Sequence, residues 1–204
     1  QDKIKFLYGH ILECLLVFLS RTAGHTVTDE QKTVTVNGVV GHQDAIVDDV
    51  LVDFKSASSY AFKKFKENTI HSDDPFGYIA QISAYAKANN LDKAGFIAID
   101  KSSGEICYCP VHSMEMINAE ERIESLKQTV KSDIAPPRCY SDIPDGKSGN
   151  HKLHIGCVYC SYKHVCWSDA NGGQGLKKFN YSTGPRYLTR VGRTPDVEEI
   201  HDEI

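Results

Sequence analysis

The hydrophobic positions in the first part of the chain predict a helix followed by strands. Residues 3–20 are apolar at most positions, which predicts one helix that is apolar around most of its circumference and therefore buried. Strands rich in β-branched residues follow, and we expect them to form an antiparallel meander over residues 32–36, 39–47 and 50–58. Asn37-Gly38 is a strong hairpin turn, and Asp48-Asp49 turns the chain again.

Helices and strands alternate further along, until a turn-rich region replaces them. The pattern predicts a lysine-rich surface segment at 60–68, a helix at 73–90, strands at 94–100 and 105–111, and a polar helix from Ser113 to about Asp133. Beyond residue 135 the chain is rich in glycine, proline and cysteine. We therefore expect an α/β protein, with a central mixed sheet flanked by helices in residues 1–134. An irregular, cysteine-rich module in residues 135–204 is expected to pack on this core.

The net charge argues against a protein that coats nucleic acid indiscriminately, since the 204 residues carry a formal charge of −4 at pH 7. Residues 171–195 nevertheless contain no acid and five basic residues: Lys177, Lys178, Arg186, Arg190 and Arg193. Aromatic residues interleave with them, which fits a path for single-stranded DNA, with cations at phosphates and rings on bases. The alternative is a solvated segment that packs its rings on its own domain. Lys63 and Lys64, in a second lysine cluster, have the same two interpretations.

An acid and a lysine share one face of the strand at 50–58. Because side chains alternate along a strand, Asp53 and Lys55 point the same way. Asp44, on the preceding strand, can approach Asp53 across the pair. Two converging carboxylates suit Mg²⁺ or Mn²⁺, and a lysine beside them can stabilise a phosphate or help deprotonate water. The alternative is a solvent-facing ion pair on an edge strand.

Two helical signals accompany this strand. Glu13 interrupts the apolar first helix one turn after Gly9, so it must reach water, a partner or a metal; the alternative is a glutamate at the helix edge. Gly9 itself suggests close approach of another backbone. Gln81 and Tyr85, four apart on a predicted helix, share one face and can grip a phosphate or a base, but are equally typical of an ordinary amphipathic helix.

Taken together, these motifs resemble those of the PD-(D/E)XK nucleases. The matching segments are Gly9-x-x-x-Glu13, Gly41-His-x-Asp44, Asp53-Phe-Lys55 and Gln81-x-x-x-Tyr85, in the order and spacing of the RecB-type and lambda-exonuclease-like branch, which includes the iron–sulfur nucleases of CRISPR adaptation. The family's usual proline before the first aspartate is absent. Glu13 matches the first-helix position where the RecB branch often has histidine, with His10 and His42 as secondary candidates.

The resemblance implies a restriction-endonuclease-like core and a Mg²⁺- or Mn²⁺-dependent DNA nuclease of viral or DNA-processing type, more an exonuclease than an endonuclease. It implies metal ligation by Glu13, Asp44, Asp53 and the backbone carbonyl of Phe54, with Lys55 as catalytic lysine and Gln81 and Tyr85 as the helix motif. The rival class is a non-catalytic DNA-binding module with the same kind of fold and a zinc knuckle. An oligomer, or a replication or recombination partner, does not follow from the sequence.

Three of the seven cysteines lie close together, as Cys157-x2-Cys160-x5-Cys166, which is a strong ligand signal. Cys139 is the preferred fourth ligand, and Cys14 is the rival. Four thiolates permit zinc or iron–sulfur, and His154 and His164 keep a mixed Cys/His zinc site open. The resemblance favours a 4Fe–4S cluster that staples the C-terminal module to the core. Cys107 and Cys109 share one face of a strand and are expected to pack.

No apolar run reaches the roughly 20 residues that span a bilayer. No secretory signal pattern opens the chain, and cysteines without such a signal favour metal or cluster ligation over disulfides. We therefore expect a cytoplasmic protein (in the host cytoplasm, if viral) whose partner is DNA and not a membrane.

Overall fold

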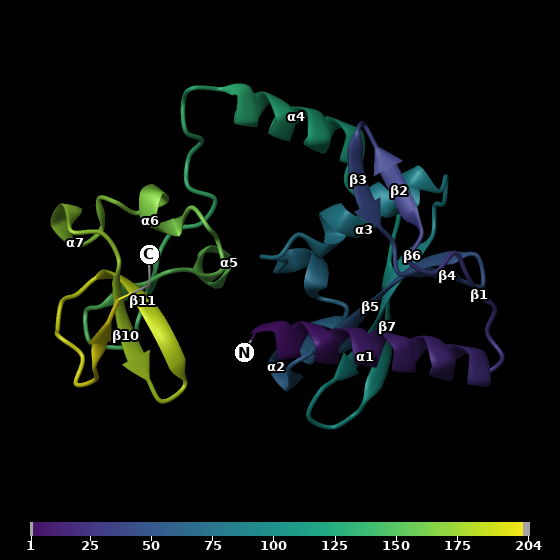
Figure 1. Cartoon of the computed structure of the whole chain (residues 1–204), viewed down its shortest axis with the longest axis horizontal. Helices are drawn as coiled ribbons and strands as arrows, with labels where there is room; N and C mark the ends of the chain where they lie inside the picture. Colours follow the sequence, from purple (N-terminus) through teal and green to yellow (C-terminus); the bar gives the residue numbers. More distant parts are fainter. Residues whose placement is uncertain (1, 202–204) are drawn as a thin grey trace. The chain divides into compact units, whose positions relative to one another are not determined.

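In the computed structural model, which describes residues 2–201, the chain folds into two units that divide between Asp133 and Ile134 (Figure 1). The centre of the first unit is a five-stranded sheet in the order β1-β4-β5-β6-β7. Its strands are β1 (Val27–Thr28), β4 (Ala45–Val47), β5 (Val50–Ala57), β6 (Ala94–Asp100) and β7 (Ile106–Val111). The pair β5 and β6 is parallel and the other pairs are antiparallel. The expected mixed sheet flanked by helices is thus confirmed.

Different helices cover the two faces of the sheet. Successive residues of β5 contact different helices because side chains alternate between the faces along a strand. On one face, Val52 and Phe54 pack with Leu16 of α1 (Asp2–Thr22). On the other, Leu51 and Ala57 join an apolar cluster with residues of α2 (Ser59–Lys66) and α3 (Tyr78–Ala88). The segment expected to be a lysine-rich surface stretch is therefore an amphipathic helix, α2, whose Phe62 and Phe65 are buried.

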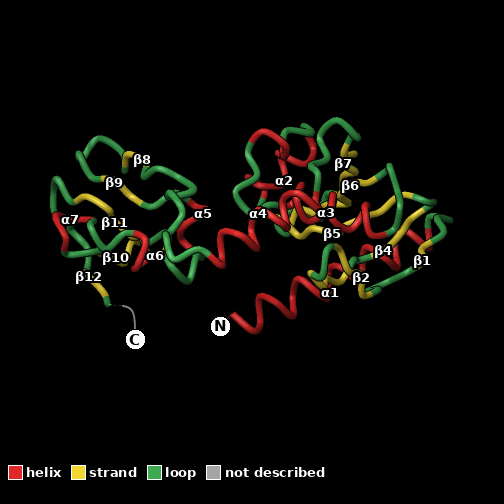
Figure 2. The backbone as a smooth tube through the Cα atoms, turned by 90° about the horizontal axis from the view of Figure 1, so that it is seen from above, coloured by secondary structure: helices red, strands yellow, loops and turns green. Residues whose placement is uncertain are grey.

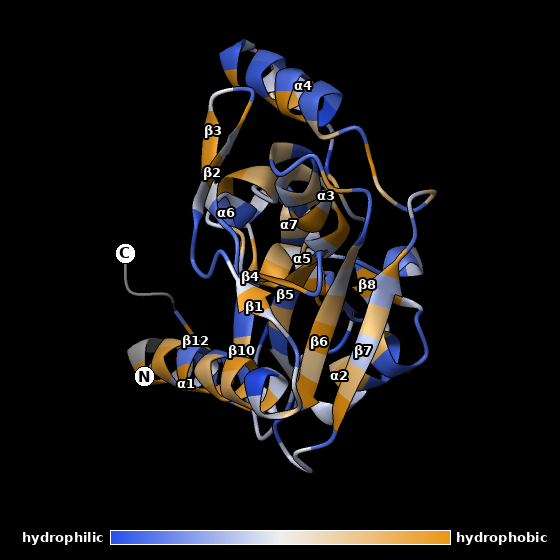
Figure 3. Cartoon of the chain, turned by 90° about the vertical axis from the view of Figure 1, so that its right-hand side faces the viewer, coloured by the Kyte–Doolittle hydropathy of each residue, from blue (hydrophilic) through white to orange (hydrophobic). Residues whose placement is uncertain are grey.

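The first helix is not buried around its circumference, contrary to expectation. Among its described side chains, only Leu12, Leu16 and Val17 are buried, while Phe6 is 78% exposed. Figure 3 shows apolar colour along much of α1. Cys14, expected in a buried position, is exposed. No described helix is both long enough and apolar enough to cross a lipid bilayer.

The close backbone approach expected at Gly9 is also absent. A Cβ added there would lie 3.9 Å from the Ser56 Oγ, an ordinary van der Waals distance, and no backbone atom outside the helix is nearer.

The expected three-stranded meander is split into two sheets at Gln43. Residues 33–42 form a separate hairpin of β2 (Thr33–Val36) and β3 (Val39–His42), and only the following β4 joins the main sheet. Gln43 is fully buried at the junction. Its Nε2 donates to the Asp29 carbonyl at 3.2 Å and its Oε1 accepts from Asn89 Nδ2 at 2.5 Å. These bonds fix the break because a buried amide needs its partners.

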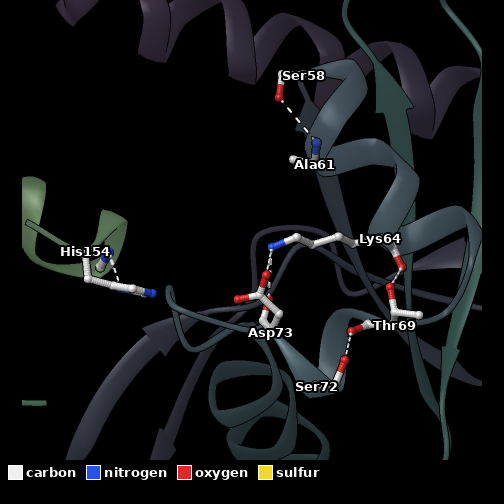
Figure 4. A network of polar contacts seen from close by, with 8 residues as sticks. Ser58, Ala61, Lys64, Thr69, Ser72, Asp73 and His154 are labelled. Atoms are coloured by element: carbon white, nitrogen blue, oxygen red, sulfur yellow. Dashed lines mark hydrogen bonds and ion pairs between the residues drawn. The ribbon is translucent and has the colours of Figure 1, made fainter. Parts of the chain in front are cut away.

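The two expected strand-to-strand turns fall where the sequence places them. Asn37 and Gly38 have the positive φ angles of a two-residue hairpin turn, and so do Asp48 and Asp49. The connection before α3 contains a short 3-10 helix, η1 (Ile70–Ser72), in which Ser72 Oγ donates to the Thr69 carbonyl at 2.8 Å (Figure 4).

Helices α3 and α4 (Ala119–Lys131) begin later than predicted. Helix α3 starts after Gly77, with the Asp74 carboxylate accepting from the first helical N–H groups. The polar helix α4 is capped by Asn118, not by Ser113. The Asn118 side chain accepts from the backbone N–H of Glu121 at 3.3 Å, which satisfies a helix-end donor.

The second unit is more regular than its composition suggests. It contains a five-stranded antiparallel sheet in the order β12-β10-β11-β9-β8, seen as yellow segments in Figure 2. The strands are β8 (Ile143–Pro144), β9 (His151–Lys152), β10 (Lys177–Tyr181), β11 (Gly184–Arg190) and β12 (Glu199–Ile200). The basic stretch is thus the hairpin β10–β11. Between β9 and β10 lie three four-residue helices: α5 (Ile155–Val158), α6 (Lys163–Cys166) and α7 (Ala170–Gly173).

We predict that Gln43→Leu destabilises the first unit by about 2–4 kcal/mol, because it strands the Asn89 amide and the Asp29 carbonyl without their partners. Denaturant unfolding followed by far-UV circular dichroism measures the loss. Trp167, the single tryptophan, lies in the second unit, so its fluorescence transition serves as an internal control. Gln81→Leu, at an exposed position, is the matched variant; equal destabilisation by both substitutions would contradict the role of Gln43.

Candidate active site

Two carboxylates meet where β4 and β5 separate. The ladder between these strands ends at the pair Ala45–Val52, so Asp44 and Asp53 lie one position beyond it. The Asp44 Oδ2 accepts a hydrogen bond of 2.7 Å from the backbone N–H of Phe54. Since the N–H and C=O of one strand residue point to the same side, the Phe54 carbonyl faces the same side as Asp44. The structure therefore brings together three groups that the sequence proposed as oxygen ligands.

Asp53 and Lys55 form a buried ion pair. Asp53 is 2% exposed, and Lys55 Nζ lies 2.5 Å from its Oδ2. Apart from Lys55, no described residue donates to this buried oxygen. Lys55 Nζ also lies 4.9 Å from the centroid of the Tyr78 ring, a cation–π contact. The alternative of a solvent-facing pair on an edge strand is therefore wrong.

The charges at this site are unbalanced. Burial, and next the negative charge of Asp53, raise the pKa of Asp44 to about 7. Burial also raises the pKa of Asp53, although Lys55 acts against it. Burial lowers the pKa of Lys55, but the neighbouring carboxylates outweigh this and raise it above its ordinary value. The lysine is therefore held as a cation, and one cation does not offset the carboxylates around it.

Glu13 adds a third carboxylate from α1. Its Oε1 accepts from Gln31 Nε2, and its Oε2 lies 3.5 Å from His10 Nδ1. The side chain is partly buried, and its charge raises the pKa of both Asp44 and Asp53. Glu13 and Asp44 line the same pocket of about 300 Å³, which has room for an ion and water. The structure thus places Glu13 at the carboxylate pair.

Gln81 and Tyr85 contact each other, and Tyr85 also packs against the β2–β3 hairpin. Gln81 Nε2 donates to the Tyr85 hydroxyl at 3.2 Å. The Tyr85 ring packs under Gly41 so closely that a Cβ there would lie 2.7 Å from Cε1. No described contact joins either residue to Asp53. Their role at a substrate remains a prediction, while Gly41 is explained by this ring.

The sequence did not reveal Tyr78 and Gln31 as parts of the site. Tyr78 contacts Lys55, and Gln31 contacts Glu13. The only available signal for Tyr78 was its spacing, one helical turn before Gln81. Gln31 lies in a turn with positive φ, where no motif distinguishes it. His42, a secondary candidate, has its Nδ1 3.2 Å from the Thr33 hydroxyl within the hairpin.

The proposed DNA-binding lysines of α2 have acidic partners. Lys64 pairs with Asp73 (Figure 4) and lies over the Tyr60 ring. Lys63 Nζ is 3.6 Å from a Glu67 carboxylate oxygen. Such exposed pairs are weak, so both lysines can exchange their partners for phosphate, and their DNA contacts remain a prediction.

The basic hairpin of the second unit combines both interpretations. Phe179 and Tyr187 are buried in their own unit, as the alternative of packed rings predicts. The cations also have local neighbours: Lys177 Nζ lies 3.9 Å from Glu199 Oε1, Lys178 Nζ lies 5.4 Å from the Tyr187 ring centroid, Arg186 Nη1 lies 3.0 Å from Asp145 Oδ1, and Arg190 acts on the pKa of Asp142. A strand-binding path along these cations remains a prediction.

Three thiols act on Cys157 in the second unit. Burial raises the pKa of Cys157, and the thiols of Cys166, Cys160 and Cys139 raise it further. The indole N–H of Trp167 acts in the opposite direction. Apart from the Cys157 sulfur, this buried N–H has no hydrogen-bond acceptor among the described residues. The preferred set of four cysteines therefore shares one neighbourhood.

Neither site is preassembled around an ion. Within residues 2–201, no three or more His, Cys, Asp or Glu side chains stand close enough to bind one metal ion as they are oriented. His154 Nδ1 accepts from the Gly156 N–H, and its ring stacks on Tyr140 at 4.3 Å. His164 packs edge-on against Tyr187. Cys109 is buried and Cys107 packs against the same cluster, as expected.

We predict that, without bound metal, Asp44 makes the folded protein less stable as the pH rises. Its folded-state pKa of about 7 lies above the ordinary 3.8, so between these values the folded chain holds a proton that the unfolded chain has lost. Stability should therefore fall as the pH rises through this range. Asp44→Asn, whose amide oxygen still accepts from Phe54, should remove the part of this slope that Asp44 contributes and add about 2–4 kcal/mol at pH 8. Asp53, whose pKa is also raised, should keep its own part. Urea unfolding at pH 5 and 8 tests this, with Asp49→Asn as control; an unchanged slope in Asp44→Asn would contradict it.

No protein-family model and no curated protein matches the chain. Two solved structures resemble its chain path. The crystal structure of SSO0001 is 15% identical, with a TM-score of 0.43, and the match covers 79% of this chain and 70% of that one. The crystal structure of an alkaline exonuclease (LHK-Exo) from Laribacter hongkongensis is 18% identical, with a TM-score of 0.40, over 62% of this chain and 74% of that one. The chemistry of the site is therefore interpreted from its own side chains.

Proposed function

We propose that the protein is a metal-dependent nuclease that hydrolyses phosphodiester bonds of DNA, acting as an exonuclease. The observation that carries this proposal is the position of Asp44 and Asp53, two carboxylates at the parting of β4 and β5, beside the cation of Lys55. The order of the motifs in the sequence supports it, since each of the matching segments supplies a residue to the first unit.

The donor atoms fit a hard divalent cation. Asp44, Asp53 and Glu13 offer carboxylate oxygens, and Phe54 offers a backbone carbonyl, the ligand types that Mg²⁺ and Mn²⁺ prefer. The raised pKa of Asp44 shows how strongly burial and Asp53 oppose its negative charge, and a bound cation would relieve this. Such an ion, when bound, would lower the pKa of a water molecule and offset charge on the phosphate.

Lys55 would act through its charge and not as a base. Its pKa is raised by the carboxylates, so its ammonium group stays protonated at neutral pH. An ammonium fixed by Asp53 and the Tyr78 ring is preorganised to stabilise the negative charge that develops on a phosphate during hydrolysis. Lys63, Lys64 and the cations of β10–β11 would contact the DNA backbone outside the site.

We also propose that Cys139, Cys157, Cys160 and Cys166 hold a 4Fe–4S cluster, with zinc as the alternative. The supporting observation is that the other three thiols and the indole N–H of Trp167 all act on Cys157. Hydrogen bonds to cluster sulfurs are a common way in which proteins tune such groups. The cluster would stabilise the irregular segment around α5 and α6, which has little apolar core of its own.

Cleavage should depend on Asp53 and Lys55 but not on the nearby Asp49. We predict that Asp53→Asn and Lys55→Ala each reduce Mg²⁺- or Mn²⁺-dependent cleavage of end-labelled DNA by at least about 100-fold. Asp49→Asn, the same change four positions earlier in a turn where asparagine tolerates positive φ, should cleave normally. Digestion of linear and circular DNA in parallel separates exonuclease from endonuclease action.

Well-folded protein that binds DNA but cleaves no form of it with either ion would contradict the nuclease proposal and favour the DNA-binding module. Manganese uptake provides a second readout. A nuclease should bind Mn²⁺ and lose this binding in Asp44→Asn, whereas a DNA-binding module should show no uptake that depends on Asp44.

The cluster can be tested without any activity measurement. Anaerobically purified protein should be coloured, with a broad absorbance band near about 400 nm, and should contain iron. Cys139→Ser should lose the band, whereas Cys14→Ser should keep it. Zinc in place of iron, or loss of the band in Cys14→Ser alone, would contradict the assignment.

A further inference from the structure

A pocket in the second unit gathers basic side chains. It has a volume of about 590 Å³ and lies between the turn at 145–150, the hairpin β10–β11 and the segment 193–196. Its charged lining consists of Lys152, Arg186, Arg193, Asp145 and Asp196. Positive groups therefore outnumber negative ones, and Lys152 adds to Arg186 and Arg193 a cation from outside the basic stretch already expected to contact DNA.

Two of the cations share one carboxylate. Lys152 Nζ and Arg186 Nη1 each lie 3.0 Å from the same oxygen, Oδ1 of the buried Asp145. One carboxylate offsets only one of the two charges, so positive charge remains on the pocket wall. Both cations are partly exposed, and a phosphate group can reach them from the open side.

Arg186 is held in a fixed orientation. Its Nη2 donates to the Thr183 hydroxyl at 3.2 Å, and its guanidinium carbon lies 4.4 Å from the centroid of the Tyr181 ring. A planar guanidinium fixed on three sides loses little conformational entropy when it binds phosphate. Tyr181 lines the same pocket, as aromatic rings do in surfaces that bind single strands.

The walls of the pocket are rigid. The buried Asn150 accepts through Oδ1 from the backbone N–H groups of Gly192 and Arg193, each at 2.8 Å. Gly192 packs so tightly that a Cβ would lie 2.8 Å from the Gly149 carbonyl oxygen. These contacts tie the segment that carries Arg193 to the turn that carries Asp145, so the pocket is formed in advance, as ligand pockets usually are.

We propose that this pocket binds a phosphate group of single-stranded DNA, through Lys152, Arg186 and Arg193. The inference rests on the proposed action on DNA. A concave pocket of this size admits a nucleotide of an unpaired strand, whereas a paired nucleotide would first have to leave its duplex. The pocket would therefore hold unpaired DNA on the second unit, as a site separate from the carboxylates of the first.

Fluorescence anisotropy of a labelled oligothymidylate tests the proposal, with the full chain and no added divalent cation, so that DNA stays intact. Lys152→Ala and Arg193→Ala should each weaken binding about tenfold and reduce its salt dependence. Asp145→Asn should tighten binding, because both cations lose their carboxylate partner. Lys147→Ala, in the same turn but outside the lining, is the matched control and should bind normally.

The opposite sign expected for Asp145→Asn separates a binding role from misfolding, and the fluorescence of Trp167 monitors the fold of this unit. Equal binding by all variants, or a loss in Lys147→Ala as large as in Arg193→Ala, would overturn the proposal. Competition by inorganic phosphate at the same concentration as oligonucleotide phosphate would overturn the assignment to DNA. If the expected binding pattern is found but the protein cleaves no DNA after Mg²⁺ or Mn²⁺ is added, the nuclease proposal is contradicted and this inference stays intact.

Discussion

The structure of the candidate site depends on one hydrogen bond, from the backbone N–H of Phe54 to the Asp44 carboxylate. After the Ala45–Val52 pair, β4 no longer runs beside β5, and the open edge of β5 would leave a buried donor without a partner. Asp44 satisfies that donor with its side chain. The same bond holds its carboxylate beside Asp53. Burial and the charge of Asp53 make the ionised form of Asp44 unfavourable there, which raises its pKa. Local backbone chemistry and the functional proposal therefore rest on the same atoms.

The separation of the β2–β3 hairpin from the main sheet depends in turn on Gln43. If residues 39–47 were one straight strand, Asp44 would be an ordinary member of a longer ladder, and the edge of β5 would be covered. The buried amide of Gln43, bonded to Asp29 and Asn89, ends the β2–β3 hairpin and starts β4 in another sheet. A fully buried glutamine thus determines where the two strands separate, and thereby where Asp44 lies.

The sequence predicted the turns of the first unit and the shared face of Asp53 and Lys55. Alternation along a strand placed Asp53 and Lys55 on one face, and Asn37-Gly38 and Asp48-Asp49 marked turns by their tolerance of positive φ. The break at Gln43 was missed because its cause, Asn89, lies far along the chain. The exposed side of α1 was missed because apolar residues alone do not say how much of a helix will be covered. Tyr78 was missed because its cation–π contact joins a strand to a helix 23 positions away, and its helical spacing to Gln81 does not by itself indicate a contact with Lys55.

The exposed side of α1 has a consequence for the carboxylates. Among the described side chains of this helix, only Leu12, Leu16 and Val17 are buried, and Glu13 lies at the start of this short anchored region. The element that brings the third carboxylate is therefore fastened to the sheet by few contacts, and such elements open more readily than the strands of a core. A cation bound by both Glu13 and the aspartates would hold the helix against the sheet. Its binding free energy would then be shared between coordination and the local ordering of α1, coupling the occupancy of the site to the mobility of one helix.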